Sequence, residues 1–328
     1  MDVCAVVMAA GEGKRMNTNH SKVVQWAAGK PIIRWVAGAL NGVGAKEQVY
    51  IVGHRQEEVR EVLGEDVAFV LQEKQLGTGH AVMQATPFLE GRNGCTIVLP
   101  GDAPLITSDT LRAAIELFEK GDYGAVVVSA VADDPAGYGR LIRDAEGNVT
   151  RIVEDRDATD EEKKICEINS SIYCFRTPLL ISALGRIGAK NAQKEYYLPD
   201  TIEILIRDGH KVGAYIANFD ETRGVNDRIE LQRAGKILNR MICAKHMRNG
   251  VQIMDSDTTW IDDSVEIGCD SVILPGTILR GNTRIGEECL IGQNTRIDDS
   301  VVSDRTTVEQ SVLRDCTVGR NCRIGPFS

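Results

Sequence analysis

The sequence contains no long hydrophobic segment. Its longest apolar runs, at residues 3–10 and 96–99, are far shorter than the roughly 20 residues that a membrane-spanning helix needs. The first residues also lack the basic segment, the extended apolar stretch and the small-residue cleavage site of a secretory signal. We therefore predict a protein without a membrane span that stays in the cytoplasm.

The cysteines do not form a recognisable framework. They are odd in number, nine in all, and no two of them have the C-x-x-C spacing typical of zinc or redox sites. Scattered thiols of this kind fit a reducing compartment. We expect the four late cysteines to pack as small hydrophobic residues; they are Cys269, Cys289, Cys316 and Cys322.

An excess of positive charge is also missing. The chain has 38 Lys and Arg against 47 Asp and Glu, which gives a formal net charge of -9. Binding along a nucleic acid backbone needs clustered cations, so we predict no nucleic acid partner. A single nucleotide is not excluded, because a few local cations, backbone amides and a metal ion can hold its phosphates.

The first part of the chain alternates β-branched runs with helix-like stretches. Strands are predicted at residues 3–8, 48–52, 68–72, 96–99 and 125–131. This alternation indicates an α/β domain with a mainly parallel, Rossmann-like sheet. Ligands of such sheets bind outside the carboxyl ends of the strands, so the loops there are the places to look for chemistry.

A helix is predicted between residues 228 and 249. Its apolar residues recur near helical spacing, and Gly250 follows as a C-cap; they are Ile229, Ala234, Ile237, Leu238, Met241 and Ile242. We interpret this segment as a linker helix, although a surface helix packed on either neighbour would have the same pattern.

After Gly250 the pattern becomes a hexapeptide repeat. An aliphatic residue recurs at the same interval seven times, at Ile261, Ile267, Ile273, Leu279, Ile285, Ile291 and Ile297. The phase then shifts and is predicted to resume at Val312, Val318 and Ile324. This repeat predicts a parallel β-helix whose coils stack one inward aliphatic side chain on the next. Because solenoids need covered ends, we expect either that this chain is a shortened form of a longer protein or that a partner or another subunit of a trimer protects the last coil.

A glycine-rich loop follows the first predicted strand, at residues 8–16 (MAAGEGKRM). Such a loop lets backbone amides approach phosphate oxygens closely. It has neither the third glycine of the dinucleotide fingerprint nor the Gly-Lys-Ser/Thr of a P-loop, so alone it could equally be a tight connection. Lys14, Arg15 and Lys22 add three cations within a short segment, which suits a reaction that brings phosphates together. A solvated basic loop is the alternative.

The predicted strand at residues 96–99 ends in Pro100, Gly101 and Asp102. This order places a carboxylate at the carboxyl edge of the sheet. A Gly-Asp pair is also ordinary turn chemistry. Beside a phosphate-binding loop, however, Asp102 is a natural magnesium ligand, because Mg²⁺ prefers oxygen donors.

Several further motifs occur in a fixed order. After the glycine loop and Lys22 come residues 28–31 (AGKP), 75–81 (QLGTGHA), 137–140 (GYGR), 167–169 (EIN), 191–193 (NAQ), 195–197 (EYY) and 224–226 (GVN). Together they resemble the N-acetylglucosamine-1-phosphate uridyltransferase / glucosamine-1-phosphate N-acetyltransferase (GlmU) family, over nearly the whole chain. The resemblance implies a uridyltransferase domain at 1–227, a linker helix at 228–250 and a left-handed β-helix at 251–328, shorter than the family's.

The resemblance also implies roles for individual residues. Ala9, Ala10, Gly11 and Gly13 would line the nucleotide with Asp102, Arg15 and Lys22 would bind and activate its phosphates, and Gln72, Gly77 and Thr78 would hold uracil. Gly139, Glu154, Asn169 and Asn226 would hold the sugar, and Asp102 and Asn226 would share the catalytic Mg²⁺. The side-chain amide of Gln72 can donate and accept, which suits an imide edge but does not exclude thymine.

Two residues depart from the family pattern within the phosphate loop. Ser21 stands where the family usually has proline, and Lys14 stands where many members have threonine. Neither change removes a proposed ligand, but both could alter the stiffness of the loop or its affinity for phosphate.

The resemblance implies uridylyl transfer from UTP to N-acetylglucosamine 1-phosphate by Mg²⁺-assisted in-line attack, with release of pyrophosphate. Family members have further β-helix coils that carry the acetyltransferase pocket and its catalytic histidine. None of the five histidines falls in the β-helix segment here, so the resemblance implies no acetyl transfer by this chain. His80 is interpreted as a packing residue, since a sugar phosphate is already ionised near neutral pH. The acidic run at 154–162 is interpreted as a solvated loop.

Two alternatives remain open. The same fold could use another substrate pair, such as dTTP or ATP with glucose 1-phosphate. The chain could also be a non-catalytic assembly subunit, although the set of Arg15, Lys22, Asp102 and Asn226 argues against that. From the family we expect a homotrimer formed through the β-helix.

Overall fold

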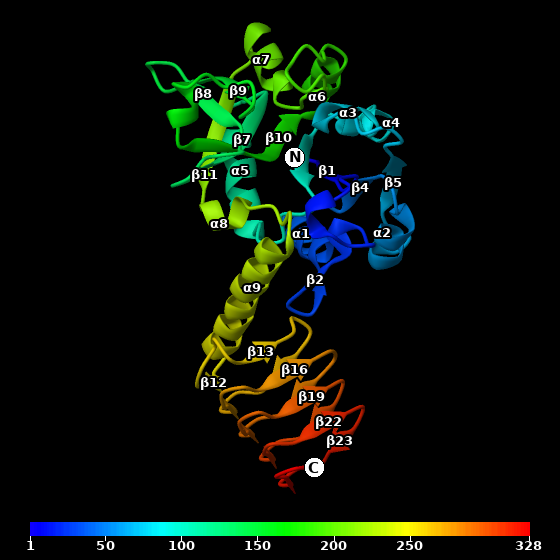
Figure 1. Cartoon of the computed structure of the whole chain (residues 1–328), viewed down its shortest axis with the longest axis vertical. Helices are drawn as coiled ribbons and strands as arrows, with labels where there is room; N and C mark the ends of the chain where they lie inside the picture. The colour runs from blue at the N-terminus through cyan, green and yellow to red at the C-terminus, as the bar shows by residue number, and fades with distance from the viewer. The chain divides into compact units, whose positions relative to one another are not determined.

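A computed structural model describes all residues from 1 to 328 and divides them into two units (Figure 1). The α/β unit consists of Met1–Gln25 and Ile32–Arg228. The β-helix unit consists of Trp26–Pro31 and Ile229–Ser328. No helix in either unit has the length and apolar character that crossing a membrane requires. The domain boundaries predicted at residues 227 and 250 stay predictions.

The α/β unit is built on one sheet of nine strands, and the order along its main path is β11-β7-β10-β6-β1-β4-β5. The strands of this path are β1 (Val3–Met8), β4 (Glu47–Val52), β5 (Ala68–Leu71), β6 (Cys95–Pro100), β7 (Ala125–Val131), β10 (Glu167–Arg176) and β11 (Val212–Ala217). β8 (Arg140–Arg143) and β9 (Val149–Val153) form a hairpin attached to β10.

The sheet is mainly parallel, as the sequence predicts. β1 pairs in parallel with β4 and β6, β4 with β5, and β7 with β11. β10 is antiparallel to both of its neighbours, β6 and β7. All five strands predicted in this part of the chain form. The centres of β1, β4, β6 and β7 are fully buried, for example at Val6, Ile51 and Val98, because helices cover both faces there and leave no room for alternating polar residues. β5, at the edge of the sheet, is only partly buried.

The helices of this unit connect the strands. They are α1 (Ile32–Gly42), α2 (Gln56–Leu63), α3 (Thr78–Met83), α4 (Thr86–Leu89), α5 (Ser108–Lys120), α6 (Thr177–Leu184), α7 (Asp200–Arg207) and α8 (Phe219–Thr222), with short 3₁₀ turns η1 (Lys14–Met16), η2 (Lys22–Val24) and η3 (Glu162–Lys164). α5 illustrates why they begin and end where they do. The Thr107 hydroxyl accepts from the Thr110 amide at its start, and Gly121 follows its last turn.

The linker helix forms as α9 (Arg228–Arg248). Ala234, Leu238 and Ile242 are buried along one face, whereas Ile229 and Met241 are exposed. The helix is held to the β-helix by buried Asn239, whose amide donates to the Thr259 carbonyl at 2.8 Å and accepts from the Ile261 amide at 3.0 Å. Gly250 follows in the left-handed region, with φ of 89°, as the predicted C-cap requires.

Three parallel sheets make the β-helix, in the orders β12-β15-β18-β21-β24, β13-β16-β19-β22 and β14-β17-β20-β23. The strands are β12 (Gln252–Ile253), β13 (Trp260–Ile261), β14 (Glu266–Ile267), β15 (Val272–Ile273), β16 (Ile278–Arg280), β17 (Arg284–Ile285), β18 (Leu290–Ile291), β19 (Arg296–Asp298), β20 (Val301–Val302), β21 (Thr307–Val308), β22 (Val312–Arg314), β23 (Thr317–Val318) and β24 (Arg323–Ile324). Ile261 stacks on Leu279, and Leu279 stacks on Ile297, so the repeat builds the core as predicted.

The predicted phase of the last coils is wrong at one position. Val312 is 50% exposed, and the adjacent Leu313, at 9%, fills the inner position by pairing with Ile297. Val302 and Val308 are fully buried between them. After Ile297, some sides of the β-helix have five residues instead of six. Counting at a fixed six-residue interval therefore misses the residue that points inward.

A short hairpin from the early part of the chain belongs to the β-helix unit. It consists of β2 (Trp26–Ala27) and β3 (Lys30–Pro31). Lys30 Nζ lies 2.7 Å from Asp263 Oδ2, and Gly29 packs so closely on Asp262 that a Cβ there would lie 2.5 Å from the Asp262 Cβ. No sequence pattern predicted this hairpin.

Candidate functional site

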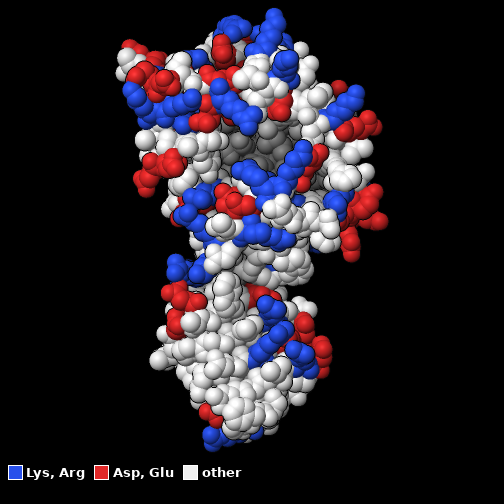
Figure 2. All heavy atoms as spheres, viewed as in Figure 1, with Lys and Arg blue, Asp and Glu red and all other residues white.

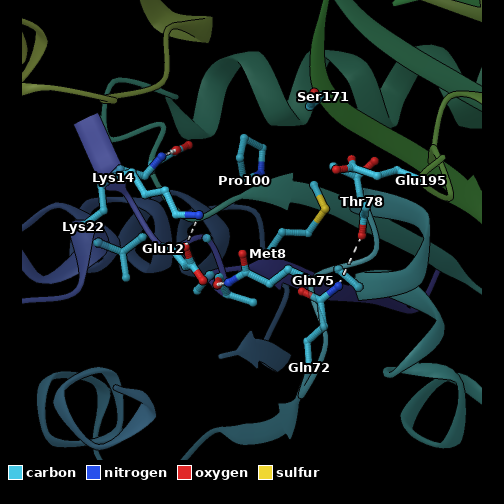
Figure 3. Close-up of a pocket in the computed structure, with 17 residues that line it drawn as sticks. Met8, Glu12, Lys14, Lys22, Gln72, Gln75, Thr78, Pro100, Ser171 and Glu195 are labelled. Atoms are coloured by element: carbon cyan, nitrogen blue, oxygen red, sulfur yellow. Dashed lines mark hydrogen bonds and ion pairs between the residues drawn. The ribbon is translucent and has the colours of Figure 1, made fainter. Parts of the chain in front are cut away.

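A cavity of about 560 Å³ opens at the carboxyl ends of the central strands. Its volume falls within the range usual for small-molecule sites. Lys14 and Lys22 lie at one end of it, and Thr78 and Glu195 at the other (Figure 3). Figure 2 shows Lys and Arg side chains beside this hollow of the α/β unit.

The glycine loop after β1 forms one wall of the cavity. Ala9 and Ala10 are buried, and both line the cavity together with Gly11. Gly13 has φ of 62°, and a Cβ at this position would lie only 2.7 Å from the Lys22 Cβ. Gly13 is therefore needed both for its backbone conformation and for the close approach of Lys22.

Three residues that are far apart in the sequence meet at the cationic end. Lys22 Nζ forms an ion pair with Asp102 Oδ2 and donates to Asn226 Oδ1 at 3.2 Å. Asp102 follows β6, and its carbonyl accepts from the Val225 amide at 2.8 Å, which holds the loop that carries Asn226. Lys22 is only 9% exposed. The structure therefore brings together the three residues that the resemblance assigns to phosphate and metal.

Arg15 stands beside this group and has no ion-pair or hydrogen-bond partner in the structure. It lines a smaller adjoining pocket together with Lys22, Gln75 and Asn226. Its neighbour Lys14 is paired with Glu12 at 2.8 Å. Of the two adjacent cations, Arg15 is thus the one available to an incoming anion.

The oxygen atoms around Lys22 suit a divalent cation. Asp102 and Asn226 each direct a side-chain oxygen at the same positive charge, the ammonium of Lys22. No group of three or more His, Cys, Asp or Glu side chains is placed to bind a metal. A metal held here would have two protein oxygens and would complete its shell with phosphate and water oxygens, as Mg²⁺ usually does.

Gln72 lies at the other end of the cavity and is 5% exposed. Its Nε2 donates to the Gly77 carbonyl at 3.2 Å and lies 3.1 Å from His80 Nδ1, so both amide hydrogens are used within the protein. Its Oε1 has no protein partner and can accept from a ligand. The His80 contact supports the interpretation of this histidine as a packing residue. Thr78 Oγ1 accepts from the Leu198 amide at 3.0 Å.

The predicted sugar residues form a second cluster. The Asn169 amide donates to the Gly139 carbonyl at 2.9 Å, and Asn169 Nδ2 donates to the Tyr173 hydroxyl at 2.8 Å. Neither Gly139, Asn169 nor Glu154 lines the main cavity. The cluster reaches the cavity through Ser171, whose amide donates to Asn169 Oδ1 at 3.1 Å and which lines the cavity wall.

A β-bulge explains this connection. The register between β10 and β7 shifts between Asn169 and Ile172, and Ser171 adopts φ of 62°. Bulges of this kind redirect side chains next to functional sites. Sequence reasoning missed Ser171, because no local pattern in residues 167–176 (EINSSIYCFR) indicates a bulge.

Gln75 was also missed as a site residue. Its Nε2 donates to the Ala10 carbonyl at 2.5 Å, and the residue lines both the main cavity and the adjoining pocket. Gln75 therefore ties the loop after β5 to the glycine loop. The available signal was its place at the head of the QLGTGHA motif.

Buried Arg140 holds the loops beside Gly139 and Glu154. It is 1% exposed, its NH1 donates to the Tyr138 carbonyl, and its NH2 lies 3.1 Å from Asp155 Oδ1. The acidic run is accordingly less solvated than predicted, since Asp155 is paired with a buried cation and Glu162 with Arg151. Arg140 connects the segment of Gly139 to the segment of Glu154.

Carboxylates gather beside Glu154. Burial, together with the charges of Asp157 and Asp200, raises the pKa of Glu154 above its ordinary value. Burial and the charges of Glu203 and Asp157 raise the pKa of Asp200 to about 6. Such a group of acids favours hydrogen-bond donors as ligands, for example sugar hydroxyl groups.

The raised pKa of Asp200 predicts a pH-dependent stability. Since its folded pKa exceeds its unfolded value, the favourable contribution is complete at low pH and is lost as the pH rises through about 6. Asp200→Asn should therefore gain stability relative to the wild type between pH 4.5 and 7.5, by about 1 kcal/mol after allowance for solvent screening. Urea unfolding at several pH values measures this difference.

The decisive quantity is how the stability difference between variant and wild type changes with pH. Its absolute value is less informative, because Asp200→Asn also removes a charge from the N-terminus of α7, which lowers the stability of the variant. Glu203→Gln, which removes one of the neighbouring charges, is expected to flatten the pH dependence of the wild type. A constant difference between wild type and Asp200→Asn across this range would contradict the assignment.

Comparison with known proteins gives consistent matches. The family described as MobA-like NTP transferase domain matches residues 5–165, and the bacterial transferase hexapeptide family (six repeats) matches residues 264–299. A protein of Caldanaerobacter subterraneus subsp. tengcongensis named bifunctional protein GlmU is 49% identical over 327 residues, which cover 100% of this chain and 71% of the relative. An Acetivibrio thermocellus protein of the same name is 46% identical over 325 residues, covering 99% of this chain and 70% of the relative.

A solved structure supports the fold alone. A Bacillus anthracis crystal structure, described as a glucose-1-phosphate thymidylyltransferase in complex with a sucrose, has a TM-score of 0.59 and 20% identity. The match covers 72% of this chain and 94% of that chain. At this level of identity, the likeness does not decide which nucleotide or sugar is used.

Proposed function

This chain belongs to the GlmU family of bifunctional proteins, and from this membership we propose that it transfers uridylyl from UTP to N-acetylglucosamine 1-phosphate. The products are UDP-N-acetylglucosamine and pyrophosphate. The observation that carries the proposal is the meeting of Lys22, Asp102 and Asn226 at one end of a cavity whose other end contains Gln72. That arrangement suits a triphosphate at one end and a base at the other.

Lys22 and Arg15 supply the charge stabilisation. In-line attack on the α-phosphorus spreads negative charge over the phosphate oxygens, and fixed cations stabilise that charge in a site with little water. Lys22 is fixed by two oxygen partners before substrate arrives, and Arg15 is unpaired. Backbone amides of the glycine loop add donors for the phosphate chain.

No general base is required. The second pKa of a phosphate monoester is about 6, so the attacking sugar phosphate oxygen is already ionised near neutral pH. His80 is engaged with Gln72 and is not needed as a base. Attack forms the new bond between that oxygen and the α-phosphorus while the bond to pyrophosphate breaks, without a covalent enzyme intermediate.

Members of this family of nucleotidyltransferases generally use a divalent metal. We propose that the metal is Mg²⁺ and that Asp102 and Asn226 would hold it. When bound, it would neutralise charge on the phosphates and orient them.

Base and sugar recognition follow from the two remaining groups. Gln72 Oε1 would accept from the imide N–H of uracil, with Gly77 and Thr78 beside the base. Gly139, Glu154 and Asn169 would hold the sugar, where the carboxylate cluster around Glu154 suits hydroxyl donors. An imide acceptor does not separate uracil from thymine, so dTTP is the nearest competing substrate.

Substrate profiling tests this assignment. Pyrophosphate release should be at least about tenfold faster, measured as kcat/KM, for UTP with N-acetylglucosamine 1-phosphate than for dTTP or ATP with glucose 1-phosphate. An enzyme-coupled pyrophosphate assay with every nucleotide and sugar pair gives the comparison. If glucose 1-phosphate is the better acceptor, the roles given to Glu154 and Asn169 are wrong.

The assembly and the compartment are part of the proposal. Figure 2 shows a broad face of the β-helix unit with few charged residues, as a subunit interface requires, and we place a homotrimer contact on this unit. The nine free cysteines support a reducing cytoplasm. The expected lack of acetyl transfer stays a prediction.

A further inference from the structure

Glu58 on α2 binds the loop that precedes Lys22. The Ser21 amide donates to Glu58 Oε2 at 2.7 Å. His20 Nδ1 lies 3.3 Å from Glu58 Oε1, and Arg55 NH1 donates to the same oxygen at 3.5 Å. Both carboxylate oxygens of Glu58 are therefore engaged. The shortest of the three contacts is the hydrogen bond from the backbone amide of Ser21.

Ser21 is the residue through which this bond acts on Lys22. It is 6% exposed and immediately precedes η2, whose first residue is Lys22. The Ser21 carbonyl accepts from the Val24 amide at 3.3 Å and from Gln25 Nε2 at 3.4 Å. The peptide units on either side of Ser21 are thus fixed, one by Glu58 and the other by η2.

We propose that Glu58 is a positioning residue that holds the Lys22 loop ready for the triphosphate. The inference rests on the proposed function, because it assigns a substrate-dependent role to the loop. Glu58 does not line the cavity, so it acts through the Ser21 amide and touches no substrate. A carboxylate that accepts from a buried amide makes a strong, charge-assisted bond, and no other group takes this amide.

The backbone conformation of Ser21 is one that proline could also adopt, so the hydrogen bond to Glu58 can be compared with the restraint of a proline ring. Its φ is -56° and its ψ is 139°, which proline also adopts without strain. Proline, the residue that the family pattern favours here, would fix φ but has no N–H for Glu58. In this chain a hydrogen bond to Glu58 supplies the restraint that the proline ring would supply.

Loss of the bond lowers the fraction of loops in the competent conformation. Apparent affinity falls in proportion to that fraction, while the bound complex reacts normally. Glu58→Ala is therefore expected to raise the KM and Kd for UTP about tenfold, with kcat and the KM for the sugar phosphate within about twofold of the wild type. Glu58→Gln, which keeps an acceptor oxygen, should recover most of the loss.

Two variants serve as matched controls. Glu57→Ala removes a carboxylate from the same first turn of α2, but Glu57 is exposed and contacts nothing in the loop, so the UTP affinity should not change. Ser21→Ala keeps the backbone N–H and should also behave as the wild type. Together they separate the Glu58 bond from helix-terminal charge and from the serine hydroxyl.

The decisive experiment is a double-mutant cycle with Ser21→Pro. In the Ser21→Pro background, Glu58→Ala should no longer change the UTP Kd, because the bond is already absent and φ is fixed by the ring. Steady-state kinetics and isothermal titration with Mg²⁺ and UTP give the values. Should Ser21→Pro fail to fold, the contrast of Glu58→Ala with Glu58→Gln and Glu57→Ala decides.

An active wild type with a Glu58→Ala variant of unchanged UTP affinity would overturn the inference and leave the proposed function intact. The same tenfold loss in both the Ser21 and the Ser21→Pro backgrounds would also overturn it. A wild type that releases no pyrophosphate from UTP would instead overturn the proposed function.

Discussion

Replacing Asp102 by alanine should lower kcat for uridylyl transfer by about a thousandfold or more, equivalent to about 4 kcal/mol of transition-state stabilisation. Two side chains direct an oxygen at Lys22. Asn226 supplies a neutral amide oxygen, and Asp102 supplies the only carboxylate. Its removal leaves a site with little affinity for a divalent cation and an unpaired buried ammonium. Initial rates of pyrophosphate release, measured across a range of Mg²⁺ concentrations, give the effect.

Two further variants make this result specific. Asp102→Asn keeps the shape of the side chain and one oxygen, so the residual activity should require a higher Mg²⁺ concentration than the wild type. Asp109→Ala removes an exposed carboxylate on α5, which pairs only with Arg112, and should leave the rate within about twofold of the wild type. Turnover of Asp102→Ala within about tenfold of the wild type, with the same metal dependence, would remove Asp102 from the mechanism and from the metal site.

Replacing Lys22 by methionine should reduce kcat/KM for UTP by about a hundredfold to a thousandfold. Methionine keeps much of the volume of a side chain that is only 9% exposed, so packing against Gly13 is retained while the charge is lost. Lys22→Arg is expected to recover little, because a planar guanidinium does not present the compact charge that contacts both Asp102 and Asn226. Kinetics at saturating sugar phosphate measure the loss.

The control for this prediction is Lys46→Ala, since Lys46 is exposed and remote from the cavity lining. Arg15→Ala should resemble Lys22→Met in lowering kcat/KM for UTP, because Arg15 is the other cation available to phosphate. Circular dichroism and thermal unfolding establish that the variants are folded. A Lys22→Met enzyme that retains more than about a third of the wild-type kcat/KM would remove Lys22 from the mechanism.

Local patterns predicted most of the fold. The apolar runs mark the five strands, and four of these strands are buried on both faces and so need no polar residues. The hexapeptide interval marks the β-helix because every side of a regular coil contributes one inward residue. Where a side has only five residues, as between Val308 and Leu313, the six-residue interval does not hold. Val312 was therefore wrongly predicted to point inward.

Long-range pairings set the limit of such prediction. No periodicity indicates that β10 runs antiparallel between β6 and β7, or that the hairpin at Trp26–Pro31 belongs with the β-helix. The same holds for the site. The glycine loop and Asp102 can be recognised at strand ends, but the approach of Asn226 to Lys22 across the chain depends on tertiary structure and was implied only by the family resemblance.

Residues that act by contact with other site residues were the hardest to predict. Gln75 heads the QLGTGHA motif but was not singled out as a site residue, and Ser171 and Glu58 belong to none of the motifs. Gln75 binds a backbone carbonyl, Ser171 lies in a β-bulge, and Glu58 binds one backbone amide. These contacts exist only in the folded chain. The departure at Ser21 was evident in the sequence, and the structure supplies its physical consequence.

The central claim is that this site joins UTP and N-acetylglucosamine 1-phosphate in one step. Phosphorus NMR of the two substrates with Mg²⁺ and enzyme follows every phosphorus atom. The account predicts that UDP-N-acetylglucosamine and pyrophosphate appear in equal amounts with the wild type and that neither appears with Asp102→Ala on the same timescale. Unchanged substrates in the presence of folded wild-type enzyme would contradict it.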